Sequence, residues 1–302
     1  MVQPDRLPQS LWVPEPATTE PATTEPAAPE PATTGGAPGL SGGDATWVPT
    51  ELARGPWSRD ALHGGPVAAI LARAVERCDP DAARDMHVAR FTLELLRPVP
   101  VAPLGVRAYV SRPGYKVQVV DAHLTLDGTE VARARAVRLR TATGSGPGEA
   151  APSVAPRRAP FAGPDEAVAQ PSPRWDYPGF HNAGADLRFA SGGMDEPGPA
   201  AVWIRLAVPV VPGEAPSPLQ RVVAAADFGN GVSAVLPFEQ YRFINPDLTV
   251  SCAHPASGEW VGLEAETSLG TPGIGVAQSV LWDTGGAGPV GRAVQSLLVE
   301  AR

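Results

Sequence analysis

An aspartate in the C-terminal half of the sequence stands in a run of small and apolar residues. Asp227 follows three alanines and precedes Phe228. A carboxylate among apolar neighbours must find hydrogen-bond partners, and an ionised carboxylate held by them can accept a proton as a general base. The alternative is a structural role, in which Asp227 caps the segment that follows it.

Two glycine-rich segments could place backbone N–H groups against a ligand. Gly229-Asn230-Gly231 follows Asp227, and free N–H groups at a helix start suit a developing oxyanion. The second segment is His63-Gly64-Gly65-Pro66, where glycine allows close approach of the backbone. We therefore take His63, Gly64, Gly65, Gly229 and Gly231 as candidate substrate-binding residues. As an acid or base, His63 lacks an acidic partner nearby in the sequence.

The motifs of several other chemistries are missing. The sequence contains no HExxH, CxxC or phosphate-binding GxxxxGK[ST] pattern. We accordingly expect neither a metal nor a cofactor. Cys78 and Cys252 lie far apart, which favours free thiols and a cytoplasmic location.

The elements that must position these residues occur twice. In the first half, apolar residues recur at helical spacing from Pro66 to Cys78, and Asp79-Pro80 ends the helix. Strand-like segments follow at residues 88–96, 105–111, 116–126 and 131–140. One helix with an antiparallel sheet is an α+β unit.

The second half repeats this order. Ser217-Pro218 is typical of a helix start, and strand-like segments follow at residues 248–252, 260–268, 275–283 and 291–299. The sequence VAAIL at 67–71 matches VSAVL at 232–236, and VARA at 131–134 matches VGRA at 290–293. Such self-similarity indicates a diverged duplication, in which Leu62 corresponds to Asp227 and Ala136 to Gln295.

Composition places the remaining boundaries. Residues 15–34 are a low-complexity Pro, Ala, Thr and Glu run, so we expect residues 1–44 to be a disordered tail. The predicted domains are residues 45–143 and 174–302, joined by a Pro/Gly-rich linker at 144–173. LWVPE at 11–15 resembles TWVPTE at 46–51, but the pattern alone gives this likeness no role.

The overall charge excludes some partners. A formal net charge of -8 argues against nucleic acid and anionic membrane surfaces as partners. No apolar run approaches the ~20 residues of a membrane span.

Several stretches together resemble the double-hotdog thioesterases of the acyl-CoA thioesterase II-like family. They lie between Trp47 and Arg302 and read RGPWSRDALHGGPVAAILARA, TLELLRPVP, PSPLQRVVAAADFGNG, FINPDLTV, GEWVGLEAET and GPVGRAVQSLLV. The resemblance implies a double hotdog, which is two tandem helix-wrapped antiparallel sheets in one chain. It also implies hydrolysis of acyl-CoA to free acid and CoA.

The resemblance further implies a catalytic set. In the family this set is an Asp near the second central helix, a Thr on the following strand and a Gln on the last strand. These carry over to Asp227, Asn245 and Gln295. An amide at Asn245 replaces the expected hydroxyl, and Thr249 is the alternative.

Two other functions stay open at this point. The first is a non-catalytic module that binds acyl-CoA or acyl-carrier-protein chains, which the exchange at Asn245 favours. The second is a hotdog hydratase, which would require a histidine shortly after Asp227, and residues 228–236 contain none. The acyl length, the carrier and a homo-oligomeric state are not determined by any motif.

Overall fold

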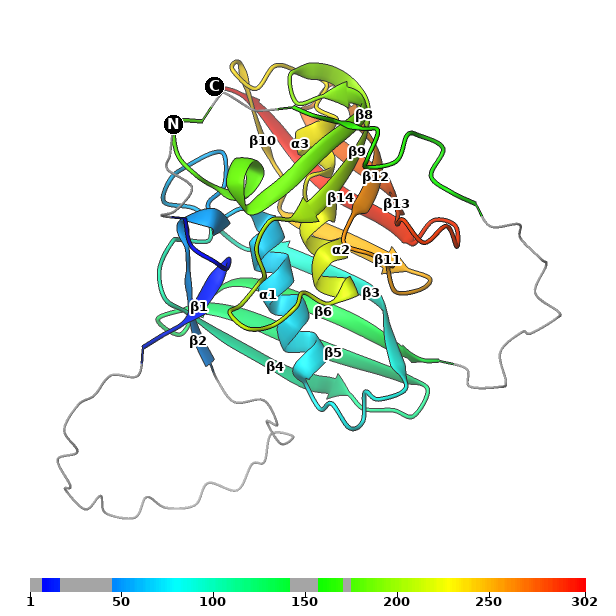
Figure 1. Cartoon of the computed structure of the whole chain (residues 1–302). Coiled ribbons are helices and arrows are strands. Elements are labelled where there is room, and N and C mark those ends of the chain that lie inside the picture. Colours follow the sequence, from blue (N-terminus) through cyan, green and yellow to red (C-terminus); the bar gives the residue numbers. More distant parts are fainter. Residues whose placement is uncertain (1–6, 17–44, 142–156, 171–174) are drawn as a thin grey trace, which may run out of the picture.

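The computed structural model describes residues 7–16, 45–141, 157–170 and 175–302. Within them, 14 strands form one antiparallel sheet in the order β1-β2-β4-β5-β6-β3-β11-β14-β13-β12-β9-β8-β7, with β10 paired to β14 (Figure 1). The strands are β1 (Trp12–Pro14), β2 (Ala45–Pro49), β3 (Met86–Leu95), β4 (Leu104–Arg112), β5 (Val117–Leu126), β6 (Thr129–Arg140), β7 (Val168–Ala169), β8 (Ala185–Gly193), β9 (Glu196–Leu206), β10 (Tyr241–Ile244), β11 (Asp247–Cys252), β12 (Val261–Leu269), β13 (Ile274–Trp282) and β14 (Gly291–Ala301).

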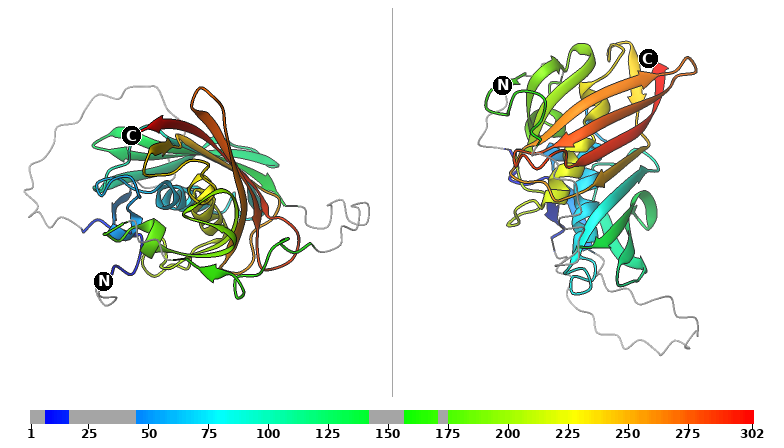
Figure 2. Two further views of the ribbon diagram at one scale, coloured as in Figure 1. Left: turned by 90° about the horizontal axis from the view of Figure 1, so that it is seen from above. Right: turned by 90° about the vertical axis from the view of Figure 1, so that its right-hand side faces the viewer.

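The sheet curves around a pair of helices, as Figure 2 shows from above. The helices are α1 (Gly64–Arg77), α2 (Pro218–Ala226) and the single turn α3 (Gly229–Val232). A 3₁₀ turn covers Glu51–Ala53, and a short π-helix covers Phe180–Gly184. In α1 every residue from Gly65 to Ala72 is buried, because α2 covers the side that the sheet leaves open.

The two halves have the same strand order outward from the centre of the sheet. It is β3-β6-β5-β4 in the first half and β11-β14-β13-β12 in the second. β3 and β11 join the halves as an antiparallel pair in which Thr92 lies opposite Thr249. The four strands expected after each helix are confirmed, so the duplication organises the fold.

One part of the expected duplication is misaligned. Val67 lies inside α1, whereas its proposed counterpart Val232 ends α3. His63 caps the start of α1 and Ser217 caps the start of α2, so these caps define the correspondence between the helices. Asp227, at the C-cap of α2, therefore does not correspond to Leu62.

The expected tail of residues 1–44 contains a folded segment. β1 pairs with β2, so that Trp12 faces Pro49 and Pro14 faces Trp47. Trp12 is fully buried, and its Nε1 donates to the Pro66 carbonyl in α1 at 3.1 Å. The expectation of disorder is therefore wrong for residues 7–16, while 1–6 and 17–44 lie outside the described residues. The two WVP copies are antiparallel neighbours in the sheet, with Val13 opposite Val48.

The expected linker also carries structure. Val168 of β7 lies opposite Phe189 of β8, and the Trp203 indole of β9 donates to the Ala162 carbonyl at 2.8 Å. Residues 144–156 and 171–173 of that linker lie outside the described residues. Sequence patterning missed β8 and β9, because glycines and prolines interrupt the alternation there.

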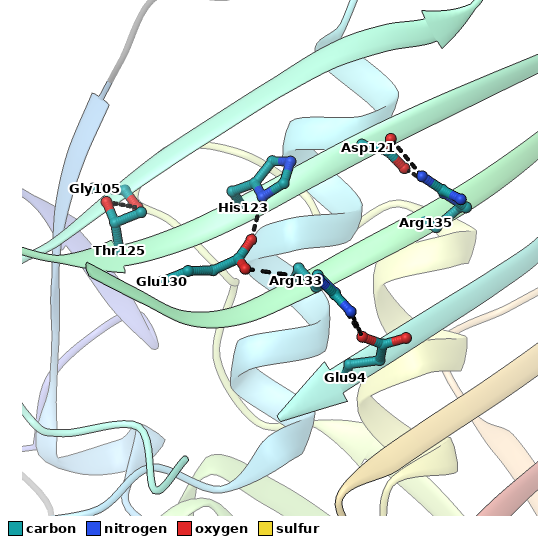
Figure 3. Close-up of polar contacts among 8 residues, drawn as sticks. All are labelled: Glu94, Gly105, Asp121, His123, Thr125, Glu130, Arg133 and Arg135. Carbon is teal, nitrogen blue, oxygen red and sulfur yellow. Dashed lines mark hydrogen bonds and ion pairs between the residues drawn. The ribbon is translucent and has the colours of Figure 1, made fainter. Parts of the chain in front are cut away.

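The outer face of the first-half sheet is polar, and Figure 3 shows its ion pairs. Arg135 on β6 donates to both Asp121 carboxylate oxygens, at 2.7 and 2.9 Å. Burial raises the pKa of Asp121, but hydrogen bonds from Arg135 and Ser111 together with the charges of Arg135 and His123 outweigh burial and leave that pKa lowered. Arg133 bridges Glu94 and Glu130. None of the helices in the described ranges is long and apolar enough to cross a membrane.

Candidate active site

Asp227 sits at the C-cap of α2, where two amides donate to one of its oxygens. Asn245 Nδ2 reaches Oδ1 at 2.8 Å, and Gln295 Nε2 reaches the same atom at 3.2 Å. Asn245 follows β10, and Gln295 points inward from β14 between buried Ala293 and Leu297. The structure thus brings together the three residues that the family resemblance implied as a set.

The orientation of the Gln295 amide is fixed by a backbone group. The Asn230 N–H, which can only donate, points to Gln295 Oε1 at 3.1 Å. The Gln295 Nε2 must therefore face Asp227. It also donates to the main-chain carbonyl oxygen of Asp227, at 3.3 Å. Gln295 is 1% exposed, so water does not compete for these bonds. Asn230, at the start of α3, has committed its backbone N–H and cannot offer it to a substrate.

His63 completes the environment of Asp227. Its Nδ1 lies 2.8 Å from the second carboxylate oxygen, Oδ2, and 3.1 Å from the Gly65 N–H at the start of α1. One ring nitrogen cannot donate to a carboxylate and accept from an amide at once. With its proton on Nδ1, His63 donates to Asp227, and with its proton on Nε2 it accepts from the Gly65 N–H. The imidazole is held between the rings of Phe180 and Phe228, with centroids 5.1 and 4.9 Å away.

The sequence did not reveal this pair, because its members lie in different halves of the chain. The only local signal was the sequence HGG before an apolar helix, which gave His63 no acidic partner. The antiparallel packing of α1 on α2 supplies the partner by bringing the start of one helix to the end of the other.

Three of the four predicted glycines, Gly64, Gly65 and Gly229, are required by close packing. A Cβ on Gly64 would lie 2.7–2.9 Å from the Asp227 carboxylate group. A Cβ on Gly65 would lie 2.6 Å from the Phe180 ring, and one on Gly229 would lie 2.9 Å from Gln295 Oε1. At Gly231 the space is open. The first turn of α1 therefore presents its N–H groups and its positive dipole end beside the carboxylate.

A cavity of about 600 Å³ lies beside Asp227. Its polar wall includes His63, Gly64, Asp227, Asn230, Gly231 and Asn245. Aromatic and aliphatic side chains, among them Trp57, Leu96, Phe228, Phe238 and Phe243, form the rest. The volume lies in the range of ligand sites, ~300–1,000 Å³. An apolar chamber with one carboxylate at its wall suits a ligand with an apolar tail and a polar reacting group.

The structure does not place Thr249 at this site. Thr249 lies on the outer face of β11, between inward-facing Leu248 and Val250. Its hydroxyl is 3.2 Å from that of Thr92 across the joint between the halves. Because alternate strand residues face opposite sides, Thr249 cannot replace Asn245 beside Asp227.

The opposite end of the helix pair repeats the plan with different residues. There the Ser217 hydroxyl, at the cap of α2, donates to Glu76 of α1 at 2.8 Å, and Gln220 Nε2 donates to the same oxygen at 2.9 Å. Burial raises the pKa of Glu76. The cavity here is smaller, about 240 Å³, and buried Arg138 lies in its wall. The first half therefore does carry an acid at the equivalent place, which the misaligned comparison with Leu62 overlooked.

Metal ligation finds no support in the described ranges, where no three His, Cys, Asp or Glu side chains gather in a way that could hold an ion. Burial raises the pKa of the Cys252 thiol to about 11, which leaves it protonated and a poor nucleophile at neutral pH.

Comparison with solved structures identifies the fold. An acyl-CoA thioesterase II, TesB2, from Mycobacterium marinum superposes with a TM-score of 0.58 at 16% identity, covering 85% of this chain and 93% of that one. A hot dog fold protein of unknown function from Alicyclobacillus acidocaldarius superposes with a TM-score of 0.67 at 16% identity, covering 87% of this chain and 96% of that one. The tesB protein of Mycobacterium avium subspecies paratuberculosis superposes with a TM-score of 0.58 at 13% identity, covering 84% of this chain and 93% of that one. The chain thus has a hotdog-type fold.

Family models locate the relationship along the sequence. No curated protein sequence matches the chain significantly. The model of the acyl-CoA thioesterase N-terminal domain matches residues 53–139, and that of the C-terminal domain matches residues 164–299. Both domains of one enzyme family are present in the order that their names require, and together they cover both halves of the sheet. The chain belongs to the acyl-CoA thioesterase family of hydrolases.

Proposed function

We propose that the protein hydrolyses acyl-CoA thioesters to the free acid and CoA, with Asp227 as the general base. The observation that carries this proposal is the Asp227 carboxylate, held by Asn245, Gln295 and His63 at the wall of an apolar cavity. Three side chains fix its position, so its lone pairs can orient a water molecule.

The chemical step follows from these positions. A water molecule bound at Asp227 attacks the thioester carbonyl carbon while the carboxylate takes its proton. The tetrahedral intermediate then collapses, the C–S bond breaks, and the proton held by Asp227 passes to the departing sulfur. The products are the carboxylic acid and the CoA thiol, and Asp227 returns to its ionised form.

The start of α1 supplies the groups for the oxyanion. Gly64 lines the cavity beside the Asp227 carboxylate, so its backbone N–H is the candidate donor to the oxyanion. Fixed N–H donors are worth ~10²–10³-fold in rate when they face a developing oxyanion.

The proposed architecture is a double hotdog with domains at residues 45–143 and 174–302. Each domain contributes one central helix, and the site lies where they meet: His63 comes from the first, and Asp227, Asn245 and Gln295 come from the second. Neither half alone contains the whole set, which gives the fusion of the two units a catalytic reason.

Thiol release from acyl-CoAs of increasing length tests the proposal. Asp227→Asn keeps the shape of the side chain and removes the base, and Gln295→Ala removes its support. We expect both to lower kcat by ~10²-fold or more. Glu76→Gln is the matched control, because Glu76 occupies the equivalent place at the other end of the helix pair, and it should leave kcat within about twofold. Binding of acyl-CoA without turnover of any chain length would instead identify a binding module.

A second candidate, hydration of an enoyl thioester, is supported by one observation. The hotdog hydratases use an Asp–His pair, and His63 lies 2.8 Å from Asp227. The absorbance of an enoyl-CoA separates the two reactions, because hydration removes the conjugated double bond and keeps the thioester. Loss of that absorbance without thiol release would favour the hydratase.

A further inference from the structure

A second histidine in the cavity wall has no protein partner. His181 lies in the short π-helix at Phe180–Gly184, lines the same cavity as Asp227, and is 4% exposed. Both of its ring nitrogens are buried, and neither has a hydrogen-bond partner within the described residues. Buried polar atoms in native proteins are nearly always hydrogen-bonded, so a group with two free nitrogens calls for an explanation.

The neighbours of His181 cannot supply the missing bonds. The rings of Trp175 and Tyr177 approach it edge-on, with centroids 4.3 and 6.1 Å away. The Trp175 indole N–H donates instead to the Pro56 carbonyl at 2.8 Å, and the Tyr177 hydroxyl donates to the Gly55 carbonyl at 2.9 Å. The donor hydrogens of these two neighbouring side chains are therefore already committed.

Burial also determines the charge of this side chain. Burial, with a smaller contribution from the nearby His63, lowers the pKa of His181 to about 3. The imidazole is therefore neutral at physiological pH, with one donor and one acceptor nitrogen. A neutral ring gives no charge attraction to a carboxylate or phosphate. It matches a neutral polar group such as a hydroxyl or a ketone oxygen.

The position of His181 identifies the part of the ligand that it would contact. Its neighbour Phe180 packs directly on His63, so His181 lies close to the proposed reaction centre but does not touch Asp227. A group that reaches it from a thioester whose carbonyl lies at Asp227 therefore lies close to that carbonyl. Around it, the wall of the cavity is largely aromatic and aliphatic.

We propose that His181 is a specificity residue that hydrogen-bonds a hydroxyl or oxo group carried on the acyl chain. The preferred substrates are then hydroxyacyl or oxoacyl thioesters, in place of plain fatty acyl thioesters. This assignment rests on the proposed function for the identity of the thioester, but the polar contact itself does not require turnover.

The physical reason for discrimination is the cost of an unpaired group. A plain acyl chain in this cavity would exclude water and leave the imidazole N–H and lone pair without partners. Sites built to hydrogen-bond a substrate reject the analogue that lacks the group more strongly than apolar pockets reject an extra methylene. A single neutral hydrogen bond of this kind corresponds to roughly tenfold in affinity.

Binding of non-hydrolysable thioether analogues of acyl-CoA tests the inference apart from catalysis. The panel pairs a plain chain with chains of the same length that carry one hydroxyl, moved stepwise from the thioether end to the chain end. For wild type we expect at least one hydroxylated analogue to bind about tenfold tighter than the plain chain. His181→Phe should abolish this difference, and His181→Gln, which keeps a donor and an acceptor, should preserve part of it.

The outcomes separate the two proposals. Equal affinity of wild type for plain and hydroxylated analogues would overturn the role of His181, whether or not thioesters are hydrolysed. A hydroxyl preference without thiol release from any acyl-CoA would retain the role of His181 and refute the hydrolase. If His181→Phe does not fold, as judged by circular dichroism and thermal melting, wild type and His181→Gln decide.

Discussion

Asn245 and Gln295 donate to the same oxygen of Asp227, at 2.8 and 3.2 Å, and leave the other oxygen to His63. An amide thus takes the place where the family resemblance led us to expect a threonine hydroxyl. Both groups can donate to a carboxylate, and Asn245 is long enough to do so from the segment after β10. The exchange therefore preserves the hydrogen bond that holds the base.

The first prediction concerns the charge at Asn245. Asn245→Asp places a second carboxylate at hydrogen-bond distance from Asp227, and two like charges so close oppose ionisation. We expect the acid limb of the kcat/KM profile to move to higher pH by about one unit or more. Asn245→Thr keeps a donor without the charge and should leave the limb in place. Equal profiles for the two variants would contradict the contact.

The second prediction concerns the closest approach in the site. Gly64→Ala would place a methyl group 2.7 Å from Asp227 Oδ2, so either the carboxylate or the start of α1 must shift. We expect kcat to fall by ~10²-fold, because misplacement by about 1 Å costs that much. The matched control is Gly231→Ala, in the same cavity wall, where a Cβ meets nothing within 4 Å. If both variants lose activity equally, crowding of Asp227 is not the cause.

The regular elements of both halves could be predicted from the sequence for a physical reason. The apolar residues of α1, such as Ile70 and Leu71, recur at helical spacing because one chain segment contacts both the sheet and α2. The inward residues of β14, such as Ala293 and Leu297, alternate with exposed ones for the same kind of reason. In these segments the local pattern and the long-range packing agree.

The polar contacts between distant segments could not be predicted in this way. No local pattern indicates that His63 meets Asp227, because that contact depends on the antiparallel packing of two helices from different halves. Thr249 failed as a candidate because its side of the sheet depends on strand register, which the sequence does not specify. Trp12 was assigned to a tail because its burial depends on a strand partner beyond a low-complexity run.

The third prediction uses the raised pKa of Glu76, which is caused by burial. A carboxyl whose pKa is raised by folding destabilises the fold when it ionises, so its cost appears as pH rises from the unfolded towards the folded pKa. Glu76→Gln should therefore raise the free energy of unfolding relative to wild type at pH 8. The gain should disappear below about pH 4, where the unfolded carboxyl is also protonated.

Glu214 provides the opposite case within the same fold. Hydrogen bonds from Arg73 lower the pKa of Glu214, so its contribution to stability is present at neutral pH and is lost as pH falls through the folded pKa. Glu214→Gln should lower the free energy of unfolding at neutral pH and have little effect in acid. Urea denaturation from pH 3 to 8 measures both variants, and shifts of the same sign would refute the assignment.

The last prediction tests whether the first strand belongs to the folded protein. Trp12 is fully buried, and its indole N–H donates to the Pro66 carbonyl in the first turn of α1. Trp12→Ala should lower the free energy of unfolding by about 3–5 kcal/mol, the usual cost of removing a buried large aromatic side chain. Trp12→Phe keeps most of the packing and loses the hydrogen bond, so about 1–2 kcal/mol is expected. Trp57→Ala is the control, because Trp57 is 41% exposed and its removal should cost less stability.

Since β1 pairs with β2 beside the start of α1, loss of Trp12 should also accelerate hydrogen exchange in β2 before it affects β12 or β13. Unchanged stability of Trp12→Ala would return residues 7–16 to the status of a tail.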